Sequence, residues 1–166
     1  MSEPRWLTEE QDRVWRSLLT VFHRALPEME RTFKEHGLLG VHYQILVTLC
    51  ETPDRTMRLS ELAAKANVSP SRLTHRMRPL VDGGEVVIAP CPMDGRAKNA
   101  TLTDHGFAVL EAVAPIHVED VQRLIFDQLP ADGLGAVADA LGVVAARLCE
   151  HPELLNPQEG PGATDR

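Results

Sequence analysis

The chain lacks most features of a secreted, membrane-bound or disulfide-stabilised protein. Its 166 residues include three cysteines, Cys50, Cys91 and Cys149, which lie far apart and form no CxxC pair. This spacing argues against a disulfide framework and against a structural zinc site. No apolar run reaches the roughly 18 residues that a membrane-spanning helix needs. The polar, acidic N-terminus does not look like a signal peptide. We therefore expect a cytoplasmic protein with no membrane partner.

Motifs of catalysis are also missing. The sequence contains no serine elbow, no P-loop, no paired carboxylates and no HExxH motif. Ser60 and Ser69 are explained as helix caps. No two histidines have the i, i+4 spacing of a helix-borne metal site, and no cysteine stands beside a histidine. We expect neither an enzyme nor a bound metal or cofactor.

Positive charge is scarce in the chain as a whole, but it is unevenly distributed. The net charge is −7, which at first argues against a nucleic-acid partner. Residues 55–98 nevertheless carry +4, whereas the remainder carries −11. Because phosphate binding requires a local basic face rather than a basic protein, DNA stays possible for this segment.

The stretch LSELAAKANVSPSRLTHRMRPLVDGGEVV, residues 59–87, predicts two helices joined by a tight turn. Ser69 is a favourable N-cap for the second helix, and Pro70 occupies the first helical position, where proline is preferred. Gly83 and Gly84 are expected to end that helix. The apolar seam between the two helices is predicted to consist of Leu62, Ala63, Val68, Leu73 and Leu80.

In a helix-turn-helix, the second helix enters the major groove of DNA. Its first turn usually meets base edges, which favours Ser71, Arg72 and His75 as readers, and arginine pairs well with guanine. Arg76 and Arg78 are expected to contact phosphates, which position the protein. The full set of contacts predicted on this helix is Ser69, Ser71, Arg72, Thr74, His75, Arg76 and Arg78. The alternative is an amphipathic hairpin with a solvated basic face.

A polar hairpin follows this pair of helices and is interpreted as a wing. Two strands, residues 86–89 and 99–102, are predicted to flank a tip at residues 92–96. Arg96 is a candidate for a narrow minor groove, and Lys98 is a candidate for a phosphate. Asp94 repels phosphate, so we expect it to orient Arg96 through a salt bridge.

Long helices are predicted on both sides of this unit, over residues 8–36, 104–129 and 133–150, with a shorter one over 41–51. Pro27 is expected to kink or interrupt the first of them. The first and last helices have apolar stripes that a domain this small cannot cover alone, and such stripes usually meet another subunit.

The predicted fold is therefore mainly α. It has a winged helix-turn-helix at residues 38–103 and a dimerisation region formed by the terminal helices, residues 7–37 and 104–149. The tail, residues 150–166, is rich in proline and glycine and is predicted to be disordered.

A ligand pocket is conceivable where the first, second and fifth helices meet. Trp15, Phe22, His42 and Tyr43 would line it, although plain core packing explains these residues at least as well. Cys91 is a candidate redox sensor on the wing, but an isolated cysteine is more often inert. A metal- or thiol-responsive regulator, or a winged-helix interaction module that binds no DNA, are the alternatives.

The segments LSELAAKANVSPSRLTHRMRPLVDGG, DGRAKNATLTDHG and GVHYQILVTL resemble the multiple-antibiotic-resistance regulator (MarR) family of bacterial transcription factors. The resemblance covers roughly residues 7–148. It implies a homodimer with interlaced first and last helices that binds a pseudo-palindromic operator, usually as a repressor. It also implies release of DNA when a small phenolic or lipophilic effector binds.

The chain departs from the family pattern at two places. The wing of the family commonly reads Asp-Arg-Arg, whereas Gly95 stands here between Asp94 and Arg96. One potential phosphate contact is therefore missing, and a weaker and more flexible wing is expected. Gly40 and Val41 stand where the family often has a polar residue that opens the second helix.

Overall fold

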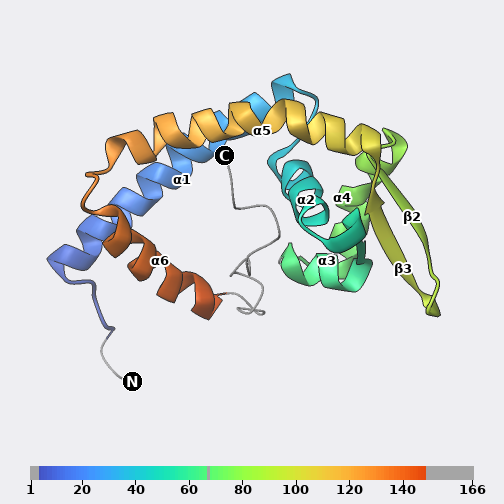
Figure 1. Cartoon of the computed structure of the whole chain (residues 1–166). Coiled ribbons are helices and arrows are strands. Elements are labelled where there is room, and N and C mark those ends of the chain that lie inside the picture. Colours follow the sequence, from blue (N-terminus) through green and yellow to red (C-terminus); the bar gives the residue numbers. More distant parts are fainter. Residues whose placement is uncertain (1–3, 67, 149–166) are drawn as a thin grey trace.

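The computed structural model describes residues 4–66 and 68–148; the predicted tail, residues 150–166, lies outside them. Two long helices, α1 and α5, run side by side, with a small helical and sheet unit at one end and α6 at the other (Figure 1). The helices are α1 (Glu9–Glu35), α2 (Gly40–Cys50), α3 (Leu59–Lys65), α4 (Pro70–Asp82), α5 (Asp104–Leu124) and α6 (Leu134–Leu148).

Helix α1 begins at a capping box, as its sequence indicates. The hydroxyl of Thr8 accepts the N–H of Gln11 at 3.2 Å, and the Gln11 side chain accepts the N–H of Thr8 at 3.0 Å. The helix continues unbroken through Pro27, so the expected interruption is wrong. Ala25 and Met29 are buried on either side of the proline, and α1 packs along α5. Tertiary packing thus offsets the hydrogen bond that proline removes.

Helix α2 begins at Gly40, where no polar side chain of its own is available as a cap. The carboxylate of Glu30, on α1, accepts the N–H of Gly40 at 2.9 Å, and a Cβ at this glycine would approach the same carboxylate closely. A negative charge suits the positive end of a helix. The missing polar cap at the start of α2 is therefore replaced by Glu30 of α1.

Helix α3 begins two residues earlier than its sequence indicates. Its N-cap is Arg58, and Ser60 lies inside the first turn, so the predicted capping role of Ser60 is wrong. Helix α4 follows the prediction: the Ser69 hydroxyl accepts the N–H of Arg72 at 3.4 Å, and Gly84 after the helix has a φ of 84°. Helix α5 is capped by Thr103 and ends at Leu124, before the predicted residue 129.

The sheet contains one more strand than the sequence predicts. Its antiparallel order is β1 (Thr56–Arg58), β3 (Asp94–Leu102), β2 (Val86–Cys91). Strands β2 and β3 are longer than expected, and only residues 92 and 93 separate them. The register shifts between Pro90, which pairs with Lys98, and Cys91, which pairs with Asp94. The bulge leaves residues 95–97 outside the regular pairing.

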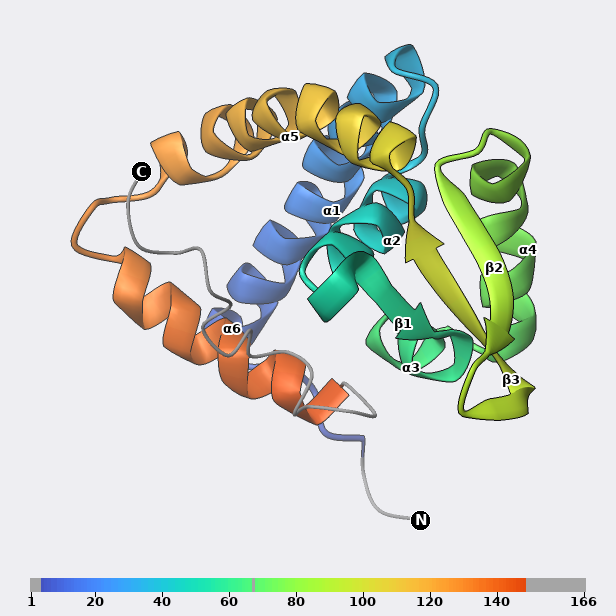
Figure 2. The same cartoon turned by 45° about the vertical axis from the view of Figure 1, so that its right-hand side comes forward.

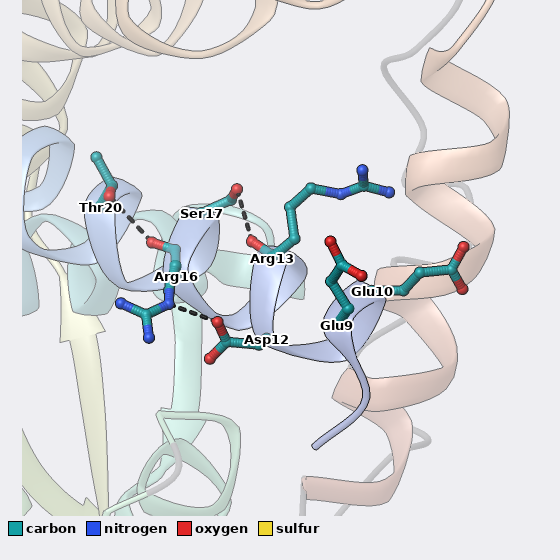
Figure 3. Close-up of a pocket in the computed structure, with 7 residues that line it drawn as sticks. All are labelled: Glu9, Glu10, Asp12, Arg13, Arg16, Ser17 and Thr20. Carbon is teal, nitrogen blue, oxygen red and sulfur yellow. Dashed lines mark hydrogen bonds and ion pairs between the residues drawn. The ribbon is translucent and has the colours of Figure 1, made fainter.

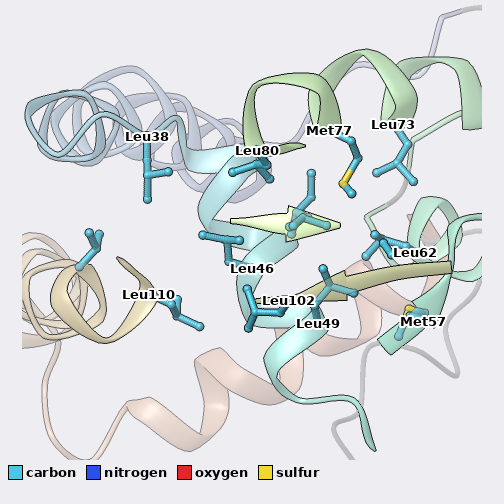
Figure 4. Packing of buried hydrophobic residues seen from close by; sticks show 14 of the residues in the cluster. Leu38, Leu46, Leu49, Met57, Leu62, Leu73, Met77, Leu80, Leu102 and Leu110 are labelled. Atoms are coloured by element: carbon cyan, nitrogen blue, oxygen red, sulfur yellow. The ribbon is translucent and has the colours of Figure 1, made fainter. Parts of the chain in front are cut away.

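The hydrophobic core lies inside the unit formed by α2, α3, α4 and the sheet, where it is extended by residues of α1 and α5 (Figure 4). Ile45, Leu46 and Leu49 on α2 and Met77 on α4 are 0% exposed. Each such side chain stabilises the fold by about 1.5–3 kcal/mol relative to an exposed one. Helix α6 has no buried residue. The winged helix is thus a closed unit, whereas α6 is not covered by the described chain.

Candidate nucleic-acid interface

Helix α4 has one buried face and one exposed face. Leu73, Met77 and Leu80 are at most 2% exposed and join the core, which holds the helix in a fixed orientation. Met77 was not among the residues predicted for the seam. The polar residues predicted to contact DNA are all exposed: Ser69, Ser71, Arg72, Thr74, His75, Arg76 and Arg78.

The hydroxyls on α4 are already engaged by the helix itself. The Ser69 and Ser71 oxygens lie 3.1 Å apart, and Thr74 donates to the carbonyl of Pro70 at 2.9 Å. Arg78 is 3.7 Å from the carboxylate of Asp82 in an exposed ion pair. These side chains have local partners that compete with an external ligand.

Arg72, His75 and Arg76 differ from their neighbours. None of them makes a side-chain hydrogen bond or an ion pair within residues 4–66 and 68–148. A solvated cation without an intramolecular partner gives up few protein contacts when it binds a phosphate or a base edge. The two arginines and the imidazole of His75 therefore form the surface of α4 that is available to an external ligand.

The hairpin β2–β3 stands beside α4, which packs against β2 (Figure 2). Arg96 and Lys98 are exposed on β3, and their contacts to a minor groove and to a phosphate stay predictions. The carboxylate of Asp94 accepts the backbone N–H of Arg96 at 3.1 Å. Asp94 therefore shapes the backbone before Arg96 instead of forming the expected salt bridge with its guanidinium, which stays unpaired within the described residues.

A hollow of about 420 Å³ lies between the start of α2 and the exposed side of α4. Its lining combines three cationic or imidazole side chains of α4 with apolar groups: Leu39, Val41, His42, Arg72, His75, Arg76 and Pro79. The pKa of His42 is lowered, mainly by burial and also by Arg76, although Glu30 and Glu85 oppose this effect. The hollow thus has the charge and the apolar surface that suit an organic anion.

The four residues predicted to line a ligand pocket do not share a cavity of the described chain. Trp15 and Phe22 are each 48% exposed on α1, whereas His42 lines the hollow beside α4. Tyr43 packs in an aromatic cluster with Phe33 and His117, at ring-centroid distances of 4.9 and 4.7 Å. Long-range packing decides these positions, which helical periodicity does not reveal.

Another hollow is a surface feature of α1 alone (Figure 3). It measures about 580 Å³, and its lining is polar: Glu9, Glu10, Asp12, Arg13, Arg16, Ser17 and Thr20. Arg16 is already paired with Asp12 at 2.6 Å, and the Ser17 and Thr20 hydroxyls donate to carbonyls of the same helix. One exposed helix face does not enclose a ligand, so we assign no site here.

A polar network that the sequence did not reveal joins α1 to α5. Asp120 is 8% exposed, accepts a hydrogen bond from Thr32 at 2.5 Å and binds Arg123 at 2.7 Å. The bond from Thr32, followed by that from Arg123, lowers the pKa of Asp120. Burial lowers the pKa of the nearby His117. The contact between Thr32 and Asp120 spans 88 residues of sequence, and no local pattern predicts such a pair.

Two other predicted features can be placed. Cys91 is 6% exposed, so its thiol is covered, and it pairs with Asp94 at the tip end of the wing. Within residues 4–66 and 68–148, no three histidine, cysteine or acidic side chains are grouped as a metal site. Across the same residues, every helix is too short or too polar to span a membrane.

The exposed cationic face of α4, the adjoining hairpin and the buried brace of α3 define a winged helix-turn-helix protein. No family model and no curated protein sequence matches the chain. Solved structures do. Sco3205, a MarR family transcriptional regulator from Streptomyces coelicolor in complex with DNA, is 37% identical over 89% of this chain and 93% of its own, with a TM-score of 0.83.

A second regulator from Streptomyces coelicolor, AbsC, is 34% identical over 87% of this chain and 98% of its own, also with a TM-score of 0.83. BpsR from Bordetella bronchiseptica, whose DNA binding is regulated by 6-hydroxynicotinic acid, is 18% identical and has a TM-score of 0.72 over 86% and 98% of the two chains. The chain belongs to the MarR family of transcriptional regulators. The expectation of a non-enzymatic regulator is confirmed.

Proposed function

We propose that this protein regulates transcription by binding duplex operator DNA through α4 and the β2–β3 wing. The observation that carries the proposal is the exposed surface of Arg72, His75 and Arg76, which have no side-chain partner among the described residues and are held outward by a buried opposite face. Sco3205, with the same fold and 37% identity, is known in complex with DNA. We propose a cytoplasmic location, because a regulator of this family must reach DNA to act.

The proposed form that binds DNA is a homodimer on a pseudo-palindromic site. Apolar side chains of α6 are exposed in the single chain, among them Leu141 at 49% and Leu148 at 76%. Trp15 and Phe22 are exposed on α1 in the same way. Burying these side chains against a second copy would remove them from water, and two-fold symmetry would present two recognition helices to successive major grooves. Such binding over a promoter acts as repression.

We also propose that a small aromatic acid acts as effector in the hollow beside α4. A carboxylate bound to Arg72 and Arg76 would neutralise the charges that face DNA, while Val41 and Pro79 would contact its apolar body. BpsR shows that the fold accommodates such regulation, since 6-hydroxynicotinic acid regulates its DNA binding.

The operator is best identified by selecting bound sequences from a random duplex pool. The proposal predicts an inverted repeat with half-sites about one helical turn apart. On that operator, Arg72→Ala should weaken binding by about 10-fold and relax the preference at one base pair of each half-site. Arg31→Ala, which removes an exposed arginine of α1, is the matched control. A pool without enrichment would contradict the proposed DNA recognition.

The effector proposal is tested on the same operator with 6-hydroxynicotinic acid as the probe. Release of DNA by the wild type, and weaker release from the variant Val41→Glu, would support an acid bound in this hollow. Isothermal titration without DNA separates binding of the acid from its effect on DNA. If neither this acid nor simple benzoic acids bind, the assignment of the hollow is wrong, whereas DNA recognition is unaffected.

A further inference from the structure

The first turn of α5 is fixed to the segment that follows the recognition helix. The Thr103 hydroxyl donates to the carbonyl of Gly84 at 2.8 Å, and the Thr103 N–H donates to the carbonyl of Glu85 at 3.0 Å. Gly106 approaches the Glu85 carbonyl so closely that a Cβ would collide with it. One side of the first turn of α5 is therefore held in a fixed position relative to the end of α4.

The opposite side of the same turn is held by Arg55. This residue belongs to the short link between α2 and β1. Its Nη1 lies 3.2 Å from the Asp104 carboxylate, and its guanidinium carbon lies 4.0 Å from the centroid of the Phe107 ring. An ion pair and a cation–π contact thus bind one side chain to two residues of α5.

The backbone that presents Arg55 is strained. Asp54 and Arg55 have φ values of 54° and 51°, the left-handed region that residues with a Cβ disfavour. The turn is held by the Arg55 N–H, which donates to the carbonyl of Thr52 at 2.9 Å, and by the Thr56 hydroxyl, which donates to that of Asp54 at 3.0 Å. Two successive strained residues at a junction indicate a conformation that has a role.

We propose that Arg55 is a positioning residue for DNA recognition. Its contacts fix the angle at which α5 leaves the winged helix. Helix α5 packs along α1 and leads to α6, so it connects the winged helix to the terminal helices whose apolar side chains are exposed (Figures 1 and 2). In the dimer of the proposed function, on which this inference rests, that angle sets the separation of the two recognition helices. Arg55 would therefore determine which half-site spacing is bound best.

This role differs from a phosphate contact, which the charge of Arg55 would also permit. A phosphate contact releases counterions, so its loss lowers the slope of log affinity against log salt by about 0.9 on a single half-site and by about 1.8 on an operator bound by two chains. Loss of such a contact also weakens binding to a single half-site, and by as much as it weakens binding to each half of a full operator. A positioning role leaves both the slope and the single half-site nearly unchanged, and acts only where two half-sites must be met together.

The experiment measures the affinity of the full-length protein for operators whose half-sites are separated by different numbers of base pairs, and for a duplex with one half-site. For Arg55→Ala we expect about 5- to 10-fold weaker binding to the best-spaced operator, the range that an exposed ion pair and one cation–π contact supply together. We expect less than about a twofold change on the single half-site. The spacing profile should become flatter, with an unchanged salt slope.

Three further variants make the test specific. Arg55→Lys keeps the charge beside Asp104 and the cation above Phe107, so it should restore most of the spacing preference. Phe107→Leu keeps Arg55 itself but removes its stacking partner, so it should flatten the profile partially. Asp54→Gly relieves the strained backbone without removing a contact of Arg55, and should retain the wild-type profile. Circular dichroism confirms that each variant is folded.

The outcomes separate this inference from the proposed function. An Arg55→Ala protein that is folded and keeps the wild-type spacing profile would overturn the positioning role alone. A loss on the single half-site that is about doubled in free energy on the full operator, with a lower salt slope, would assign Arg55 to a phosphate and overturn the positioning role too. A wild-type protein without any spacing preference would overturn the proposed dimeric recognition, and the positioning role with it.

Discussion

The winged helix and the terminal helix α6 contain similar apolar residues, but these residues are buried in the winged helix and exposed in α6. Leu46 and Leu49 in α2 are 0% exposed, whereas Leu141 and Leu148 in α6 are 49% and 76% exposed. Both helices were predicted from apolar periodicity, and both form. The difference shows that an apolar stripe predicts a helix with a face to bury, but does not say whether the same chain covers that face.

The largest expected effect comes from charging the exposed stripe of α6. The double variant Leu141→Glu, Val144→Glu should prevent association of two chains, because it would place carboxylates in the proposed apolar interface. Loss of the second half-site should weaken operator binding by about 100-fold or more, since linked binding events reinforce each other. Light scattering after gel filtration measures the mass, and fluorescence anisotropy measures the affinity.

Asp139→Ala is the control for that variant. Asp139 is exposed on the opposite face of α6 from the stripe, so its removal should change neither the mass nor the affinity. A charged double variant that stays dimeric would assign the subunit contact to another surface.

A second prediction concerns matched leucine truncations in the two regions. Leu46→Ala should lower the free energy of unfolding by about 2–5 kcal/mol, because it leaves a cavity in a closed core. Leu141→Ala should cost less, and its effect on the melting temperature should depend on protein concentration, as for a residue buried by association. Thermal unfolding over an about 100-fold range of protein concentration distinguishes the two cases. Identical concentration dependence would remove the contrast between the regions.

A third prediction concerns the polar contact between α1 and α5, where Thr32 meets Asp120. Asp120→Ala should lower the free energy of unfolding by about 1–3 kcal/mol at neutral pH, because it removes hydrogen bonds from Thr32 and Arg123 to a carboxylate. The control Asp127→Ala removes an exposed carboxylate that lies beyond α5.

The same network predicts a pH dependence with a definite sign. Since the pKa of Asp120 is lower in the folded protein than in the unfolded chain, its contribution is fully present above the unfolded value of about 4. The contribution is lost as the pH falls through that value towards the folded pKa. Denaturant titrations between neutral and acidic pH should therefore show a smaller acid loss for Asp120→Ala than for the wild type. Parallel curves would contradict the assignment.

The smallest expected effect is a gain of binding at the wing. A Cβ at Gly95 meets no atom within 4 Å, and Gly95 is not among the glycines with positive φ. Gly95→Arg should therefore fit without strain and strengthen operator binding by about threefold, with a salt slope steeper by about 1.8, or about 0.9 for each chain of the dimer. Gly95→Ala is the control and should change neither quantity. A weaker Gly95→Arg protein would mean that the wing requires glycine when it is bound to DNA.

The sequence was sufficient wherever the cause is local. Ser69 and Pro70 begin α4, Thr103 begins α5, and the capping box of Thr8 begins α1, because a cap acts within one helical turn. The alternation of buried and exposed residues on α4 follows from helical periodicity. These signals placed the candidate recognition surface before any tertiary contact was considered.

The sequence was insufficient wherever distant segments meet. Strand β1 has three residues, too few for a periodic signal, and exists because it pairs with β3. Pro27 remains inside a helix because its neighbours are buried. Gly40 begins α2 because Glu30 of another helix caps it. In each case a tertiary contact outweighs the local preference.

By itself, the sequence determined the order of the helices, the caps of α1, α4 and α5, and the cationic face of α4, since these depend on neighbours one turn away. Only the tertiary structure decided that Trp15 and Phe22 lie apart from His42 and Tyr43, and that Arg55 contacts α5 across 49 residues of sequence. The physical reason is that packing brings such residues together or separates them at a distance in sequence over which no local propensity acts.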